Sequence, residues 1–253
     1  MHTPQRITEA VGLWVGSLIA PIFAFGSLLR QARIFHPQGI NFRADVRSVE
    51  GADIDPRFTE LVQGLTKGDA LVRFSTGMWS VEKIMLPDVL GMSIRFRADR
   101  DDNFKPEEGA QDLLLVTSES LLQLPVAALA TNQYNFAGNA YHGMAPFQVA
   151  KQDDMILRVV PATQIDVTGT DRYQNIRQAV EEDDVVFRLE TASQSQPMKW
   201  LPLVEIRLMS EVSLDDTKLE FFPFRTGQNI IPQGFIQYMR PVPYLLSQYA
   251  RRA

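Results

Sequence analysis

The sequence predicts an α+β protein built on an antiparallel β-barrel of about eight strands, with flanking helices and an apolar helix at the N-terminus. Short apolar or alternating stretches recur along the chain from residue 40 onward, with the lengths of strands rather than of long helices. Several are separated by turn-rich or acidic connectors, such as residues 100–103. Connectors of this kind favour antiparallel neighbours over a parallel sheet with crossover helices.

The expected strands are residues 40–49, 70–79, 90–98, 112–117, 155–160, 185–189, 203–209 and 219–224. Helical patterns interrupt this series at residues 118–132 and 171–182. Residues 234–252 lack strand alternation, so we expect a helix there that is broken near Pro241 and Pro243. No internal repeat is found, and we expect an N-terminal arm at residues 1–32 and one domain at residues 33–253.

The N-terminal segment is the compositional anomaly of the chain. Residues 10–29 contain no charged residue and are rich in Leu, Ile, Phe and Val, which is long enough to span a bilayer. The spacing Gly12-x-x-x-Gly16 suits close helix packing, and Pro21 would kink the helix. Two alternatives remain open: a membrane-associated helix that spans or lies in the interface, and an arm packed against the barrel or a partner subunit.

Arg240 and Tyr244 form a pair that can ligate a metal. They are four residues apart, so on a helix they share a face. A phenol, with a pKa of about 10, is a poor ligand at neutral pH unless its phenolate is stabilised. A permanently charged guanidinium supplies that stabilisation, and ferric iron on the phenolate would add to it.

A second set of residues near the other end of the chain can do proton chemistry. His36 precedes Pro37-Gln38-Gly39, which should stop a helix and turn the chain. An imidazole that shuttles protons needs one ring nitrogen held by a partner, and Ser75 can supply it. Arg33 and Arg73 provide the cations that two haem propionates need. Together these motifs predict the two faces and the rim of a haem pocket.

In this order the motifs resemble those of the catalase superfamily, and within it the small catalase-related haem proteins. The resemblance covers nearly the whole chain after about residue 30. Residues 33–39 are similar to the family's Arg-x-x-His-x-x-Gly, residues 72–76 match its Val-Arg-Phe-Ser-Thr, and residues 240–244 are similar to its proximal Arg-x-x-x-Tyr. Residues 87–96 and 214–218 resemble two further segments of the family.

The resemblance implies haem b as the cofactor and Tyr244 as the axial ligand of its iron. It also implies His36 as the distal acid and base, with Ser75 bonded to it. Arg33 and Arg73 are the implied partners of the haem propionates. A homodimer or a higher homo-oligomer is expected by the same resemblance.

One departure from the family concerns the distal pocket. After residues 111–113 catalases carry Val-Gly-Asn, whose asparagine orients peroxide over the iron, whereas this chain has no asparagine there. Val116, Thr117 or Ser118 is left to face the pocket, and we assign Thr117 to the catalytic set. The loss predicts poor dismutation of hydrogen peroxide.

Composition narrows the choice of partners and of chemistry. With 253 residues and 45% hydrophobic content the chain can bury one substantial core. A net charge of −5 is opposite to the basic stripe that nucleic-acid binding needs, so no nucleic acid is expected. The chain contains no cysteine, which excludes disulfides and thiolate haem ligation and fits a cytoplasmic location, with membrane association through residues 10–29.

These features predict a haem-dependent peroxidase or hydroperoxidase that acts on organic hydroperoxides, including those of fatty acids. In this mechanism His36 moves a proton between the two peroxide oxygens. Two alternatives are a small catalase that dismutates hydrogen peroxide, and a non-enzymatic, membrane-associated haem-binding protein. His142, in residues 139–143, is expected to be structural, because that segment resembles a strand of the family and not a catalytic element.

Overall fold

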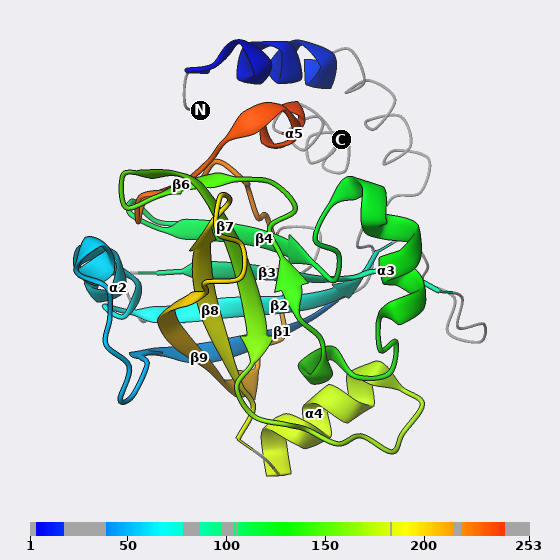
Figure 1. The fold of residues 1–253 in the computed structure, drawn as a ribbon. Coiled ribbons are helices and arrows are strands. Elements are labelled where there is room, and N and C mark those ends of the chain that lie inside the picture. Colours follow the sequence, from blue (N-terminus) through cyan, green and yellow to red (C-terminus); the bar gives the residue numbers. More distant parts are fainter. Residues whose placement is uncertain are drawn as a thin grey trace.

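A computed structural model of the protein describes residues 4–17, 39–77, 87–97, 104, 106–182, 184–214 and 219–240. Its described strands form one antiparallel sheet that closes into a barrel (Figure 1). The ring runs β7-β5-β4-β3-β2-β1-β9-β8, and β8 pairs back with β7. The strands of the ring are β1 (Gly39–Ser48), β2 (Asp69–Thr76), β3 (Leu90–Phe96), β4 (Gln111–Val116), β5 (Tyr141–His142), β7 (Gln152–Pro161), β8 (Val186–Ser193) and β9 (Leu201–Glu211). The predicted α+β barrel of about eight strands is confirmed.

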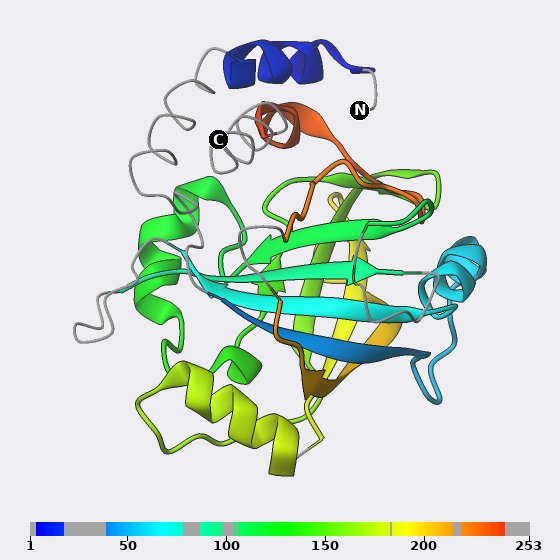
Figure 2. The same ribbon diagram turned by 180° about the vertical axis from the view of Figure 1, so that it is seen from behind.

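Two short strands and several helices complete the fold. β6 (Phe147–Val149) pairs with β7, and β10 (Ile230–Pro232) pairs with β6. The helices are η1 (Pro56–Phe58), α2 (Thr59–Leu65), η2 (Leu121–Gln123), α3 (Leu124–Ala130), η3 (Phe136–Gly138), α4 (Arg172–Glu182) and α5 (Gly234–Met239). Helices α2, α3 and α4 flank the barrel and α5 crosses one end, while the wall of β1 to β4 faces the viewer in Figure 2.

The barrel interior is an aromatic core around Phe74. Its ring centroid lies 5.3 Å from that of Phe136, 5.8 Å from that of Phe187 and 6.1 Å from that of Tyr141. Successive side chains of a strand point to opposite faces, so Phe74 in the interior places its neighbours Arg73 and Ser75 on the outer wall. Every residue of β2 is buried, so this outer wall is covered as well.

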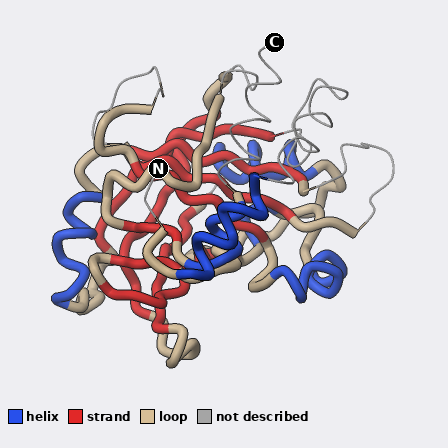
Figure 3. Tube along the Cα trace, turned by 90° about the horizontal axis from the view of Figure 1, so that it is seen from above, coloured by secondary structure: helices blue, strands red, loops and turns tan. Residues whose placement is uncertain are grey.

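The N-terminal helix, residues 7–17, packs on α5. A β-carbon on Gly12 would overlap the carbonyl oxygen of Phe235, and one on Gly16 would overlap that of Met239. Figure 3, seen from above, shows this helix lying across the molecule. The Gly-x-x-x-Gly spacing therefore brings two helix backbones of the same chain together.

The buried carboxylate of Glu9 links the N-terminal helix to the start of α5. Glu9 Oε1 accepts a hydrogen bond from the Gly234 amide at 3.1 Å, at the start of α5. Its Oε2 accepts from the amides of Gln5, at 2.8 Å, and Arg6, at 3.1 Å. One side chain thus caps the N-termini of both helices, where a negative charge is favourable.

The opposite face of the N-terminal helix is apolar and exposed. Ile7, Val11 and Trp14 follow the i, i+4, i+7 spacing of one helix face, and Trp14 is 71% exposed. In its described part the segment thus packs on α5 through its glycines and presents an apolar stripe outward. None of the helices in the described ranges has the length and hydropathy needed to cross a bilayer.

One predicted strand is wrong. Residues 219–224 form no β-ladder, and their backbone is held instead by side chains of the barrel wall. The Phe222 amide donates to Asp112 Oδ2 at 2.8 Å, and Arg95 donates to the Glu220 carbonyl. The alternation that suggested a strand reflects Leu219 and Phe221, which pack on the outside of the barrel.

Other boundaries also differ from the expectation. The helix predicted at residues 118–132 is confined to η2 and α3, and helix α2 was not predicted. The segment after residue 240 and the expected domain boundary between residues 32 and 33 lie outside the described residues.

Candidate functional site

The candidate site lies on the outer wall formed by β1 to β4. Residues that are direct partners across neighbouring antiparallel strands share a face of the sheet. Two such rows cross this wall side by side. The first row, here called the glycine row, is Gly39, Ser75, Gly91 and Val116, and the second, the arginine row, is Asn41, Arg73, Ser93 and Leu114.

Arg73 is a buried cation on this wall. It is 1% exposed, and its guanidinium lies over the α-carbon of Gly39, where any β-carbon would overlap Cζ and Nη2. The glycine therefore makes room for the arginine of the next strand. Arg33, the other predicted propionate partner, lies outside the described residues.

Ser75 occupies the middle of the glycine row. It is buried between the two glycines, and its hydroxyl donates to the Gly91 carbonyl at 3.5 Å, at the upper limit of a hydrogen bond. Gly39, its partner in β1, is three residues after His36 in the sequence. His36 itself lies outside the described residues.

The strand register separates the three residues expected to face the distal pocket, Val116, Thr117 and Ser118. Val116 pairs with Gly91 and so lies in the glycine row. The Thr117 hydroxyl instead accepts a hydrogen bond from the Leu90 amide at 3.0 Å and lies 2.8 Å from the Thr131 hydroxyl. Ser118 donates to the Ser120 carbonyl at 2.9 Å. Val116 therefore places an apolar side chain in the row, and Thr117 lies apart from it.

Arg240 lies at the C-terminal end of α5. Its φ and ψ of −78° and −38° are helical, and its Nη1 donates to Gln237 Oε1 at 3.0 Å. Arg240 thus keeps a helical backbone directly after the last residue of α5. Tyr244 lies outside the described residues.

Of two further polar residues on this wall, sequence reasoning missed Asn41 and treated His142 as structural. His142 pairs with Val116 and extends the glycine row onto β5, and burial lowers its pKa. Asn41 begins the arginine row and is 5% exposed. Neither belongs to a motif, and only the strand register brings them to the wall.

One side of the rows is closed by an apolar cluster with buried ion pairs. Leu71, Phe104, Leu219 and Phe221 pack together there. Behind them, Arg95 Nε lies 2.8 Å from Asp112 Oδ1, and Arg225 binds the other oxygen of Asp112. This network holds the wall beside the site in place.

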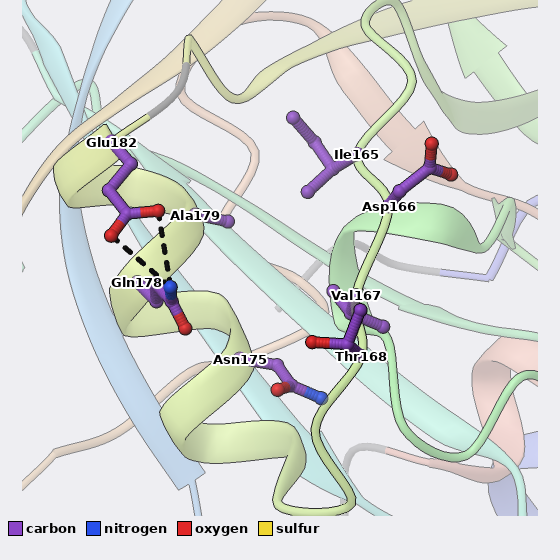
Figure 4. Close-up of a pocket in the computed structure, with 8 residues that line it drawn as sticks. All are labelled: Ile165, Asp166, Val167, Thr168, Asn175, Gln178, Ala179 and Glu182. Atoms are coloured by element: carbon purple, nitrogen blue, oxygen red, sulfur yellow. Dashed lines mark hydrogen bonds between the residues drawn. The ribbon is translucent and has the colours of Figure 1, made fainter.

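A separate hollow lies between α4 and residues 165–168 (Figure 4). Its polar side chains already have partners: Asn175 donates to the Tyr134 and Gly169 carbonyls at 2.9 Å, and Gln178 donates to the Glu182 carboxylate. No residue of the two rows lines this hollow. Over the described ranges, no cluster of three acidic or histidine side chains is placed to hold a metal ion.

Two solved structures are similar to this chain. A bacterial catalase superimposes with a TM-score of 0.60 at 13% sequence identity, covering 92% of this chain and 60% of the catalase. A fungal catalase superimposes with a TM-score of 0.53 at 11% identity, covering 83% of this chain and 57% of the catalase. The chain therefore spans about 60% of the length of these catalases.

No protein-family model matches the sequence. No curated protein matches it either. The likeness to the two catalases shows the fold, and the chain has a catalase-like antiparallel β-barrel with flanking helices.

Proposed function

We propose that the protein is a haem-dependent peroxidase that acts on organic hydroperoxides, including those of fatty acids. The observation that carries the proposal is the buried Arg73 guanidinium seated over Gly39, beside Ser75, on the outer wall of a catalase-like barrel. A buried cation on this wall suits an anionic ligand, because it balances a carboxylate, and Gly91 adds no side chain to the wall beside it.

The residues on the wall fit haem b. Arg73, with Arg33, would hold its carboxylates, and the oxygen of a buried amide, that of Asn41, has no hydrogen-bond partner within the described parts of the chain. Tyr244 would bind the iron as a phenolate, stabilised by Arg240 one helical turn earlier. When bound, haem supplies the redox chemistry of peroxide O–O cleavage.

The distal residues would move one proton. His36 is proposed to take the proton from one oxygen of the hydroperoxide and to return it to the other, so that an alcohol or water leaves. Ser75 would hold one ring nitrogen so that the other is free for this transfer. Gly39 supports this placement, because it begins β1 next to Ser75 and follows His36 by three residues.

Val116 supports the substrate class. It places an apolar side chain in the glycine row, at one of the three positions, 116 to 118, where the family resemblance expects the peroxide-orienting asparagine. An isopropyl group cannot orient hydrogen peroxide by hydrogen bonding, but it can pack against an alkyl chain. This favours an organic hydroperoxide over hydrogen peroxide as the substrate.

The test is spectroscopic first and kinetic second. Purified protein reconstituted with haem should show a tyrosinate-ligated ferric spectrum that Tyr244→Phe removes and the control Tyr249→Phe keeps. With an added phenol as the one-electron donor, two molecules of which supply the two electrons for each hydroperoxide, it should consume cumene hydroperoxide and linoleic acid hydroperoxide faster than hydrogen peroxide. Rapid oxygen evolution from hydrogen peroxide would favour a true catalase, and bound haem without turnover of any peroxide would favour a non-enzymatic haem-binding protein.

We further propose that the N-terminal segment, residues 10–29, associates with a membrane surface. The exposed stripe of Ile7, Val11 and Trp14 supports a helix that lies in the interface while its glycine face stays on α5. Full-length protein should float with phosphatidylcholine vesicles, and changing all three side chains to serine should abolish flotation, whereas the exposed control Thr8→Ala should not. Full-length protein that stays out of the vesicle fraction would overturn this association.

The proposed assembly is a homodimer or a higher homo-oligomer, which light scattering after size-exclusion chromatography would measure. A monomer at micromolar concentration would contradict it.

A further inference from the structure

The side-chain oxygen of Asn41 is buried and unpaired within the described part of the chain. The residue is 5% exposed, and its Oδ1 has no hydrogen-bond partner in the parts of the chain that are described. Burying an amide unpaired is unfavourable, and the great majority of buried side-chain polar atoms are satisfied. A group of this kind therefore points to a missing ligand at the place it faces.

The place it faces is the wall that carries Arg73. Asn41 alternates with Ile40 and Phe42, both of which are in the barrel core, so its side chain is on the outer side. It is the direct partner of Arg73 across β1 and β2, and the β-carbons of such partners lie about 4.5–5.5 Å apart. Both side chains can therefore reach one ligand group.

The chemistry of that group follows from the pair. A guanidinium has only donors, and an amide can turn about its last bond to present its NH2 group where its oxygen lies now. Two neighbouring donors, one of them charged, recognise a carboxylate. A neutral hydroxyl would pair with the amide of Asn41 alone, whereas a carboxylate can accept hydrogen bonds from both side chains.

We propose that Asn41 is a cofactor-positioning residue that binds, together with Arg73, one carboxylate of the haem. This inference rests on the proposed function and deepens it, because it names a residue outside the recognised motifs. Asn41 fixes the orientation of the haem edge on the wall, while the iron is held elsewhere.

The experiment compares two forms of the cofactor. Apo-protein is titrated with ferric haem and with haem dimethyl ester, in which both carboxylates are esterified, and binding is followed by absorbance. Asn41→Ala should weaken binding of haem about 10- to 100-fold, the effect of losing one hydrogen bond to a charged group. It should leave binding of the ester unchanged within about 3-fold. Asn41→Asp, which sets a carboxylate against a carboxylate, should weaken haem binding at least as much and spare the ester.

A matched control separates this role from general packing. Asn175 is buried to a similar extent, at 7% exposed, but its amide makes two hydrogen bonds to backbone carbonyls. Asn175→Ala should lower the thermal midpoint of the apo-protein without distinguishing haem from its ester. Asn41→Ala should leave that midpoint in place, because its Oδ1 holds no hydrogen bond within the described part of the chain.

Three outcomes are distinguishable. Selective loss of haem binding in both Asn41 variants supports the assignment. Equal losses for haem and ester, or no loss in either variant, overturn it while leaving the proposed function intact. Wild-type protein that binds neither form of the cofactor overturns the proposed function, and the role of Asn41 with it.

Discussion

The guanidinium of Arg73 lies over the α-carbon of Gly39, at the place that any side chain on residue 39 would fill. This contact joins two sequence motifs that are far apart in the chain, the His-x-x-Gly segment and the Val-Arg-Phe-Ser-Thr strand. The contact also explains why residue 39 is a glycine, because only a residue without a side chain leaves room for the Arg73 side chain from the neighbouring strand.

Gly39→Ala should therefore displace the Arg73 side chain and weaken haem binding. Arg73 is almost fully buried, so its guanidinium has little space to move aside. We expect the affinity for haem to fall about 10-fold or more, as for loss of a charge-assisted hydrogen bond, with the barrel still folded by circular dichroism.

A double-mutant cycle tests the cause. If Gly39→Ala acts through Arg73, it should cost little in an Arg73→Ala background, and the coupling between the two sites should be of order 1 kcal/mol. Independent, additive losses would show that residue 39 acts by another route.

The buried carboxylate of Asp112 should be a major determinant of stability. It binds Arg95 at 2.8 Å, binds Arg225, and accepts the Phe222 amide. Asp112→Ala would leave buried guanidinium groups without their counter-charge, which costs about 3–5 kcal/mol of unfolding free energy. Urea denaturation followed by fluorescence would measure this loss.

An exposed ion pair provides the control for Asp112→Ala. Arg177 and Glu211 are joined at 2.8 Å on the surface, and Glu211→Ala should cost at most about 1 kcal/mol. Equal losses for the Asp112 and Glu211 variants would contradict the role given to the buried pair.

The long strands could be predicted from sequence because each has a face in the core. β2, for instance, alternates Val72 and Phe74 inward with Arg73 and Ser75 outward. β5, with only two residues, has no period to detect and is defined by its neighbours β4 and β7. The false strand at residues 219–224 shows the reverse case, since its apolar alternation is real but its hydrogen-bond partners are side chains.

The candidate site was predictable where a motif marks it. Arg73 and Ser75 stand two residues apart in one motif, and in β2 they lie on one face of the sheet. The sequence left three residues, at positions 116 to 118, as candidates to face the pocket. Only the strand register shows that Val116 is the one opposite Gly91. The places of Asn41 and His142 on this wall could not be predicted, since their neighbours there come from other strands.

The packing of Gly12 on α5 gives a further prediction. A side chain at position 12 meets the Phe235 backbone, which cannot rotate away as a side chain could. Gly12→Val should undock the N-terminal helix and raise hydrogen exchange in residues 7–17 and in α5. Ala10→Val, on the exposed side of the same helix, is the control and should leave exchange unchanged. Similar exchange in both variants would mean that the glycine contact does not hold the helix.

His142 should make stability depend on pH. Burial lowers the pKa of His142 in the folded protein below the value of about 6.5 expected when the chain is unfolded. The unfolded chain therefore binds a proton more readily as the pH falls through about 6.5, and this residue's contribution to stability, complete above roughly pH 7.5, is lost on acidification. His142→Gln should flatten the slope of unfolding free energy between about pH 7.5 and pH 5.5. An unchanged slope in the variant would assign the dependence to other groups.

Val116→Asn should return hydrogen peroxide dismutation to the protein. Val116 lies in the glycine row that contains Ser75, so an amide there would face the same wall. Removing one such preorganised donor from an enzyme typically costs about 10²–10³ in rate, so we expect oxygen evolution to rise at least about 10-fold even from imperfect geometry. Turnover of bulky organic hydroperoxides should fall, because a polar group replaces an apolar contact. Thr117→Asn is the matched control, since the Thr117 hydroxyl bonds the Leu90 amide and lies against Thr131 instead of joining the row. A gain of oxygen evolution from Thr117→Asn but not from Val116→Asn would mean that Thr117, and not Val116, faces the pocket.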